Sequence, residues 1–141
     1  MGGKIATLAA ALALTGSFAS AQTLNCSFPN QRVDGWIRGQ VIIKMLGDGN
    51  ATVFDSLINQ VHGGPIPATI TTDNDKRISL KWRLKQVELR HSFAPKMDYR
   101  MTVLKDTGAA NINATAPIFS SYTNADRAGG NFGARGSCKI K

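Results

Sequence analysis

The sequence predicts an all-β protein, a seven- or eight-stranded antiparallel barrel or sandwich closed by one disulfide between its ends. Three observations predict this class. Apolar and polar residues alternate with a period of two through most of the chain. Clusters of turn-forming residues recur roughly every 8–14 positions. The two cysteines, Cys26 and Cys138, lie near the two ends of the expected domain. The spacing of the turn-forming clusters is typical of both sandwiches and up-and-down barrels and does not separate the two architectures.

The first 21 residues read as a secretory signal peptide. Lys4 gives a positive start, an apolar run follows at 5–14, and Ala19-Ser20-Ala21 forms a small-x-small cleavage site. The apolar run is shorter than the roughly 20 residues that span a membrane. We therefore expect residues 22–141 to be a single β domain that a bacterium exports to its periplasm or secretes. No later segment has the length and apolarity of a transmembrane helix.

Each predicted strand lies between turn signals. The strands are expected at residues 23–28, 36–46 (with Gly39 as a candidate bulge), 51–57, 66–72, 76–89, 99–105, 109–116 and 133–140. Turns are expected at "GDGN" (47–50) and "DND" (73–75), a loop or short helical turn at 58–65, and a connection at 91–98. The apolar positions predict a core of Phe28, Trp36, Val41, Ile43, Phe54, Ile70, Ile78, Leu80, Trp82, Leu84, Tyr99, Met101, Val103 and Ile112.

The stretch "KRISLKWRLK" (76–85) is the most regular part of the chain. Even positions are apolar as far as Leu84, whereas Val87 and Leu89 place the apolar residues at odd positions. A change of phase of this kind predicts a β-bulge, because one extra residue moves the following side chains to the other face. A helix over "LKWRLKQVEL" is the alternative, but strict alternation favours a strand.

The two cysteines predict a disulfide. In an exported protein, a lone and widely separated pair is most simply explained as a structural bridge. A closed loop of that length stabilises the fold by about 4–5 kcal/mol in the chain-entropy treatment. A redox pair normally has C-x-x-C spacing and a metal site needs more ligands, so neither is expected here.

Positive charge is concentrated in one segment. The net charge is +8 for the whole chain and +7 once Lys4 is removed with the leader, and residues 76–105 alone carry +7. In a strand, Lys81, Arg83 and Lys85 would lie about 6.6–6.8 Å apart on one face. Arg100 would join them if the next strand pairs alongside. Two explanations fit this face: a surface that binds an anionic polymer or protein, or an ordinary solvated face.

The sequence offers no recognised catalytic or metal-binding motif. His62 and His91 lack the neighbours of a catalytic or zinc site, and the acids of "DNDKR" (73–77) lack the glutamate that closes a calcium loop. Haem-attachment, phosphate-loop and G-x-S-x-G patterns are not found either. We therefore expect a non-enzymatic protein without cofactor or metal, although paired acids from distant positions remain open.

Two resemblances bear on these expectations. The signal peptide with "NCSF", "GWIRGQVII", "VFDSLI", "GGPIPA" and "FGARGSCKI" resembles small exported proteins of alphaproteobacteria, a likeness that implies no activity. The layout is also similar to periplasmic lysozyme inhibitors of the MliC type, which are small β-barrels with a cysteine near each end. The inhibitory serine-and-lysine motif of that family has no counterpart here, so the likeness is architectural.

Three functions remain as hypotheses. The leading one is a monomeric, envelope-associated binding protein that contacts an anionic envelope polymer or protein through Lys81, Arg83, Lys85 and Arg100, without specific nucleic-acid binding. The second is a small-molecule binder whose cavity is the barrel interior around Trp82. The third is an inhibitor of a cell-wall-active enzyme that acts through residues 58–65 or 117–132.

Overall fold

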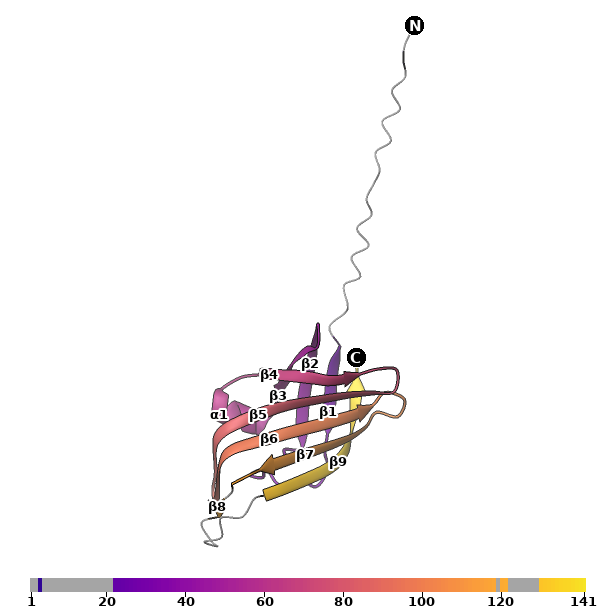
Figure 1. The fold of residues 1–141 in the computed structure, drawn as a ribbon. Coiled ribbons are helices and arrows are strands. Elements are labelled where there is room, and N and C mark those ends of the chain that lie inside the picture. The colour runs from indigo at the N-terminus through magenta and orange to yellow at the C-terminus, as the bar shows by residue number, and fades with distance from the viewer. Residues whose placement is uncertain (1–2, 4–21, 119, 122–129) are drawn as a thin grey trace.

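The fold is a closed antiparallel β-barrel (Figure 1). The computed structural model describes residue 3 and residues 22–118, 120–121 and 130–141. The expected signal peptide at 1–21 therefore lies outside the described residues, apart from Gly3. The elements are β1 Thr23–Ser27, β2 Gln40–Gly47, β3 Asn50–Phe54, α1 Ser56–His62, β4 Ile66–Asp73, β5 Arg77–Leu89, β6 Ser92–Leu104, β7 Ala109–Ala116, β8 Ser120–Ser121 and β9 Gly130–Ile140.

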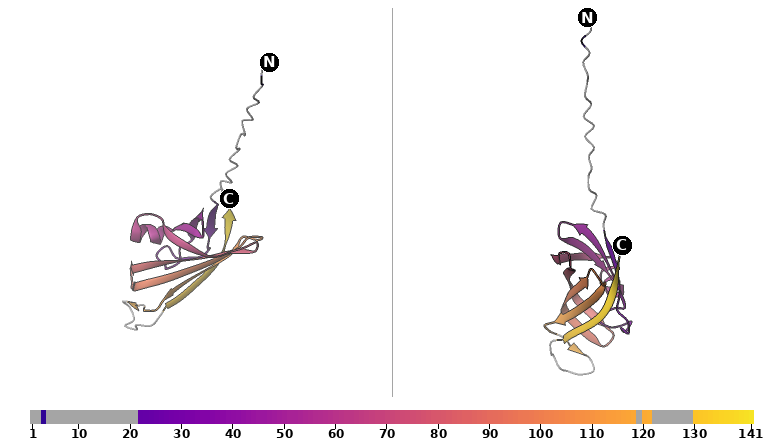
Figure 2. Two further views of the ribbon diagram at one scale, coloured as in Figure 1. Left: turned by 45° about the horizontal axis from the view of Figure 1, so that its top comes forward. Right: turned by 90° about the vertical axis from the view of Figure 1, so that its right-hand side faces the viewer.

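The pairing of the strands shows that the fold is a barrel and not a sandwich. Neighbours in sequence pair from β1 to β7, and β9 lies between β7 and β1. Pairing of β5 with β6 completes the ring, so the eight long strands form one closed barrel, and the short β8 pairs with the start of β6. The predicted all-β class is confirmed. In Figures 1 and 2, β4 to β7 form one wall of the barrel, while β1 to β3 run steeply across behind it.

The two ends of the barrel differ. Tight turns at 47–50, 73–77 and 104–109 lie at the end that carries Lys141 and the start of β1. The other end, which we call the mouth, carries the loop at 28–39, helix α1 and the β5–β6 turn. Long connections thus gather at the mouth, and loops held on a rigid scaffold are where binding functions concentrate.

Four predicted element boundaries are wrong. The strand predicted at 51–57 ends at Phe54, and Ser56 and Leu57 belong to α1. Strand β2 begins at Gln40, so Trp36 and Gly39 lie in the preceding loop and Gly39 is not a strand bulge. Residues 92–98 belong to β6 and are not a connection. Strand β9 begins at Gly130, three residues before the predicted start. In the last three cases the local pattern lacks a clean alternation, and pairing with a neighbouring strand decides the structure.

The predicted change of phase in β5 is present, but its predicted cause is wrong. The buried positions change from Leu84 to Val87 although the β5–β6 register is the same on both sides, so no extra residue is inserted. Strand β6 changes phase at the same level, between Ala94 and Met97. The step falls where Gln86, with φ of 54°, lies opposite Pro95 in this register. A residue in the left-handed region reverses the faces to which the following side chains point, and proline has no N–H to donate to the ladder there.

Helix α1 closes part of the mouth. Asp55 is its N-cap, and its side chain accepts a hydrogen bond of 2.8 Å from the backbone N–H of Ile58. Gly63 ends the helix in the left-handed conformation. Leu57 and Ile58 are fully buried, so the helix seals the barrel with an apolar face. Among the described residues, no helix has the length and apolarity needed to cross a membrane.

Side chains fill the barrel interior, as is usual for eight strands. The prediction that Phe54 belongs to the core is wrong. Phe54 is half-buried and faces away from the interior, while Ala51 and Val53 of the same strand face inward. Ile70 is partly buried and packs against the core. The other predicted core residues are buried.

The predicted disulfide joins the first and last strands of the ring. Cys26 of β1 lies directly opposite Cys138 of β9, with a Cα–Cα distance of 3.9 Å. The backbones of Thr23 and Lys141 exchange two hydrogen bonds of 2.9 Å just beyond it. The bridge therefore holds the seam at which the barrel closes. It is compatible with an oxidising, extracytoplasmic compartment.

Candidate functional site

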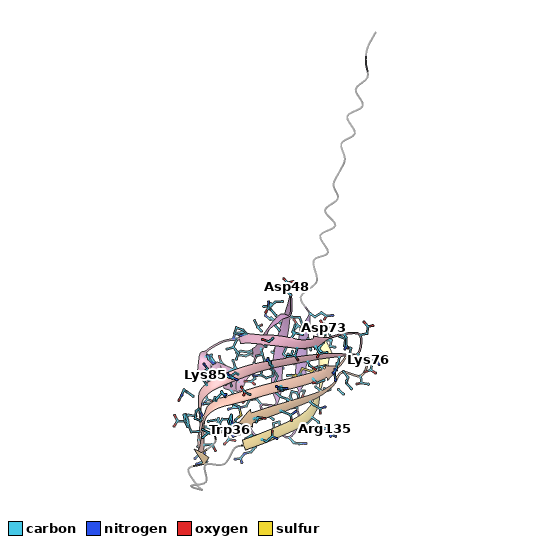
Figure 3. The ribbon with its side chains drawn as sticks, in the orientation of Figure 1. Trp36, Asp48, Asp73, Lys76, Lys85 and Arg135 are labelled. Carbon is cyan, nitrogen blue, oxygen red and sulfur yellow. A yellow bond between two sulfur atoms is a disulfide. The ribbon has the colours of Figure 1, made fainter. Side chains whose placement is uncertain are left out.

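The structure brings all four predicted binding residues onto one outer face. Lys81, Arg83 and Lys85 project outward from β5, because the alternate residues Leu80, Trp82 and Leu84 fill the interior. Strand β6 pairs with β5, and Arg100 lies directly opposite Lys81. Figure 3 shows Lys85 near the mouth end of β5. The predicted clustering of the four side chains is therefore present.

Two further residues of β6, Lys96 and Asp98, complete this surface. Lys96 lies opposite Lys85, and Asp98 opposite Arg83. Arg83 donates from Nε to Oδ1 of Asp98 at 2.6 Å, so its charge is offset. We call this surface, made of Lys81, Arg83, Lys85, Lys96, Asp98 and Arg100, the basic wall. Lys96 and Asp98 were missed because residues 91–98 were predicted to be a connection. Their even-numbered spacing with Arg100 was the available signal.

A shallow hollow of about 500 Å3 lies on the basic wall. Pro67 and Thr69 of β4 border it on one side, and Arg100 of β6 on the other. Thr69 lies opposite Lys81, and Arg100 opposite Asn113 of β7. A row of hydrogen-bond donors therefore crosses four strands at this level. Hydroxyl, ammonium, guanidinium and amide groups in one row suit a ligand rich in oxygen acceptors.

A buried polar cluster fixes the loop at the mouth. Arg38, only 7% exposed, donates to the backbone carbonyls of Gly35 (2.8 Å) and Val33 and to the Ser56 hydroxyl (3.1 Å). Because a guanidinium presents several donors in a fixed plane, one side chain ties the loop at 28–39 both to itself and to α1.

Two ionisable groups lie near this arginine. Burial raises the pKa of the Asp55 carboxyl above its ordinary value, while the hydrogen bonds from Ile58 and Leu57 and the charge of Arg38 lower it. Burial also raises the pKa of the Tyr99 phenol, and the Asp55 charge raises it further. Tyr99 is therefore a neutral hydrogen-bond donor, and its hydroxyl donates to the carbonyl of Trp36 at 2.7 Å.

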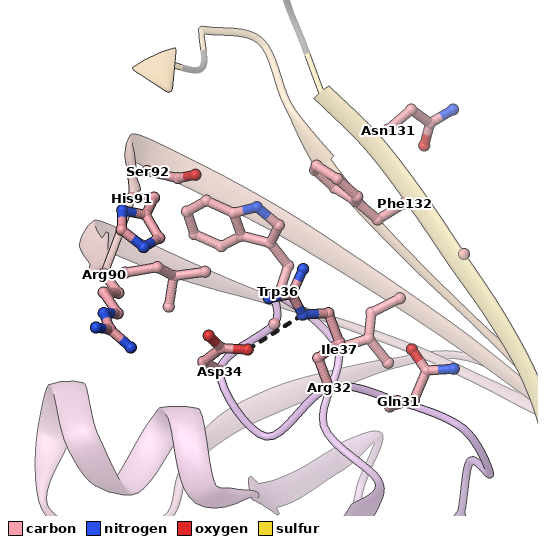
Figure 4. A pocket seen from close by; sticks show the side chains of 13 residues that line it. Gln31, Arg32, Asp34, Trp36, Ile37, Arg90, His91, Ser92, Asn131 and Phe132 are labelled. Carbon is pink, nitrogen blue, oxygen red and sulfur yellow. Dashed lines mark ion pairs between the residues drawn. The ribbon is translucent and has the colours of Figure 1, made fainter. Parts of the chain in front are cut away.

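An aromatic layer fills the barrel where the ligand cavity around Trp82 was predicted. The Trp82 ring stacks on Tyr99 with centroids 5.4 Å apart, and both residues are almost fully buried. Trp36 and Phe132 continue the layer, with ring centroids 6.1 Å apart. Trp36 and Phe132 also line a second hollow, of about 550 Å3, which opens at the mouth (Figure 4).

The remaining candidate residues lie apart. His62 ends α1, whereas His91 lies in the β5–β6 turn. Asp73 forms an ion pair with Lys105, with 2.7 Å between Oδ1 and Nζ. Among the described residues, no three histidine, cysteine or acidic side chains gather in a possible metal site. Of the segments predicted for enzyme inhibition, 58–65 contains most of α1, and most of 117–132 lies outside the described residues.

The fold and this surface define a small closed β-barrel with a basic outer wall and a plugged mouth. Comparisons with protein-family models, curated proteins and solved structures give no match. The resemblances to alphaproteobacterial exported proteins and to MliC-type inhibitors remain predictions.

Proposed function

We propose that this protein is a non-enzymatic binding module of the bacterial periplasm or exterior that holds an anionic polymer against its basic wall. One observation carries the proposal. Lys81 lies directly opposite Arg100, and Lys85 directly opposite Lys96, so two like-charge pairs lie on the same face of one hairpin.

Stability alone does not account for this arrangement. Like charges directly opposite each other across an antiparallel pair destabilise it by repulsion. Positive charge often protects a free sheet edge from aggregation, but Lys81 and Arg100 lie where β5 also pairs with β4 and β6 also pairs with β7. An anionic ligand removes the repulsion because it places negative charge between the two cations of each pair.

The spacing of the two pairs favours a polymer over a small anion. They are four residues apart along β5, which corresponds to about 13 Å. The Arg83–Asp98 ion pair lies between them and leaves no uncompensated charge there. A single carboxylate or phosphate can reach one pair, whereas a chain with repeated acidic groups reaches both and also the neutral donors Thr69 and Asn113.

Retention on immobilised heparin, measured as a function of salt, tests the proposal. The double variant Lys81→Glu with Arg100→Glu should bind at least about tenfold more weakly and show a shallower salt dependence, because fewer counterions are released. The matched control is Lys44→Glu with Lys139→Glu, which changes the net charge equally on exposed positions of β2 and β9.

The control variant should keep most of the retention. Equal losses in the two double variants would show that net charge, and not the basic wall, drives binding, and the proposal would be wrong. Circular dichroism and the urea midpoint establish that both variants are folded.

A further inference from the structure

The hollow at the mouth is built by three separate parts of the chain. The loop at 28–39 contributes Trp36 and Ile37. The end of β5 contributes Leu89, the turn after it contributes Arg90, and the start of β9 contributes Phe132. Its volume of about 550 Å3 lies within the roughly 300–1,000 Å3 typical of small-molecule sites. Figure 4 shows Trp36 at its centre, with Phe132 on one side and His91 on the other.

The walls of this hollow are held in place before any ligand arrives. Arg38 fixes the loop through the carbonyls of Val33 and Gly35, and Tyr99 fixes the carbonyl of Trp36. Trp36 is only 6% exposed although it belongs to a loop. A preformed site loses little conformational entropy on binding, so these contacts favour affinity for a ligand of matching shape.

The chemistry of the lining is apolar on the floor and cationic at the rim. Trp36, Phe132 and Leu89 supply aromatic and aliphatic surface. Arg32 and Asp34 pair with each other at 3.3 Å, so their charges offset. Arg90 also lines the hollow, is exposed, and has no acidic side chain within ion-pair distance among the described residues.

We infer that the mouth of the barrel is a second binding site, which takes a small amphipathic organic acid. The apolar body of the ligand packs against Trp36, Phe132 and Leu89, and its anionic group lies at the rim near Arg90. This site is separate from the basic wall and does not depend on the proposed polymer binding, because the two surfaces share no residue.

Two matched fluorescent probes test the inference on the full-length mature protein. 8-Anilinonaphthalene-1-sulfonate is an aromatic anion, and N-phenyl-1-naphthylamine has the same rings without the sulfonate. Both should bind with saturable fluorescence enhancement. Arg90→Gln should weaken the sulfonate about fivefold and leave the uncharged probe unchanged, because only the anion loses a charge partner.

A second pair of variants separates the hollow from general surface hydrophobicity. Leu89→Gln removes apolar wall and should weaken both probes about three- to tenfold. Leu104→Gln is its control, since Leu104 is an exposed apolar residue at the opposite end of the barrel and should have no effect. Lys76→Gln, near the same distant end, is the control for Arg90→Gln.

Nuclear magnetic resonance gives a readout that needs no substitution. The chain has two tryptophans, and their indole N–H signals report on two places. A bound probe should shift the Trp36 signal and leave that of Trp82, which does not line the hollow, almost unchanged. The inference is overturned if the indole signals do not shift, or if Leu89→Gln and Leu104→Gln weaken the probes equally. The double variant Lys81→Glu with Arg100→Glu should bind both probes as the wild type does, because the mouth and the basic wall are separate sites.

Discussion

The hydroxyl of Tyr99 donates a 2.7 Å hydrogen bond to the backbone carbonyl of Trp36, 63 residues away in the chain. This bond joins the wall of the barrel to the loop that plugs its mouth. The Tyr99 ring also stacks on Trp82, so one side chain connects the interior packing with the loop. The shape of the mouth therefore depends on the core, and substitutions inside the barrel should change the conformation or mobility of the loop at the mouth.

Tyr99→Phe should lower the free energy of unfolding by about 1–3 kcal/mol, because it leaves the buried carbonyl of Trp36 without its donor. Amide hydrogen exchange in residues 29–39 should speed up more than in β7. Thr102→Val is the control, since the Ser79–Thr102 hydroxyl pair is only part-buried, and its effect should be below about 0.5 kcal/mol. Equal effects of the two variants in urea would contradict the role assigned to Tyr99.

Gly136→Ala should destabilise the seam of the barrel by about 1–3 kcal/mol or more. A Cβ atom at Gly136 would lie 1.9 Å from the carbonyl oxygen of Ser27 and 2.9 Å from Cδ1 of Phe28, so β1 and β9 would have to separate. Gly64→Ala is the control, because its Cβ would meet nothing within 4 Å. Urea titration of both variants measures the difference, and a wild-type midpoint for Gly136→Ala would refute the close approach.

Removing the disulfide should cost stability at the same seam. Cys26→Ala with Cys138→Ala should lower the free energy of unfolding by about 2–5 kcal/mol, since the unfolded chain loses a constraint over most of its length. Urea unfolding with and without reductant measures the effect. Reductant should destabilise the wild type and leave the double variant unchanged. Two alkylatable thiols in the purified, unreduced protein would show that the bridge does not form.

Asp55 should make stability depend on pH in a defined direction. Burial holds its pKa above the ordinary value of 3.8, so the carboxylate is less favourable in the folded state than in the unfolded state. The contribution of Asp55 to stability is therefore greatest below its unfolded-state pKa, and it is lost as pH rises through the raised folded-state pKa.

Asp55→Asn isolates this effect, because asparagine keeps the N-cap of α1 but does not ionise. The stability of the wild type relative to Asp55→Asn should fall as pH increases from about 3 to neutrality. Urea titrations of both proteins across this range measure the difference. A difference that is flat, or that grows in favour of the wild type, would contradict the raised pKa.

Much of the fold follows from local chemistry that the sequence displays. Alternation from Ile78 to Leu84 identifies the inward face of β5, and "GDGN" specifies a turn in which Gly47, Asp48 and Gly49 have positive φ. Cys26 and Cys138 identify the closing pair because the chain has no other cysteine. These features depend on near neighbours or on a unique pairing, and each is visible without knowing the fold.

The site was predicted less completely. The four cations of the leading hypothesis do share one face, but their partners Lys96 and Asp98 were not found, because Pro95 and the change of phase conceal the start of β6. Trp36 was assigned to a strand, yet it anchors a loop through contacts with residues far away in sequence. Such contacts leave no periodic pattern to detect.

The sequence by itself determined the strand-forming segments, the inward and outward faces of most strands, and the bond that joins the two ends. Only the tertiary structure decided that the sheet closes into a barrel, that β5 and β6 change face together at Gln86 and Pro95, and that Trp36 plugs the mouth. The reason is physical: alternation records which side of one strand is buried, whereas closure, register and plugging depend on the packing of segments that are distant in the chain.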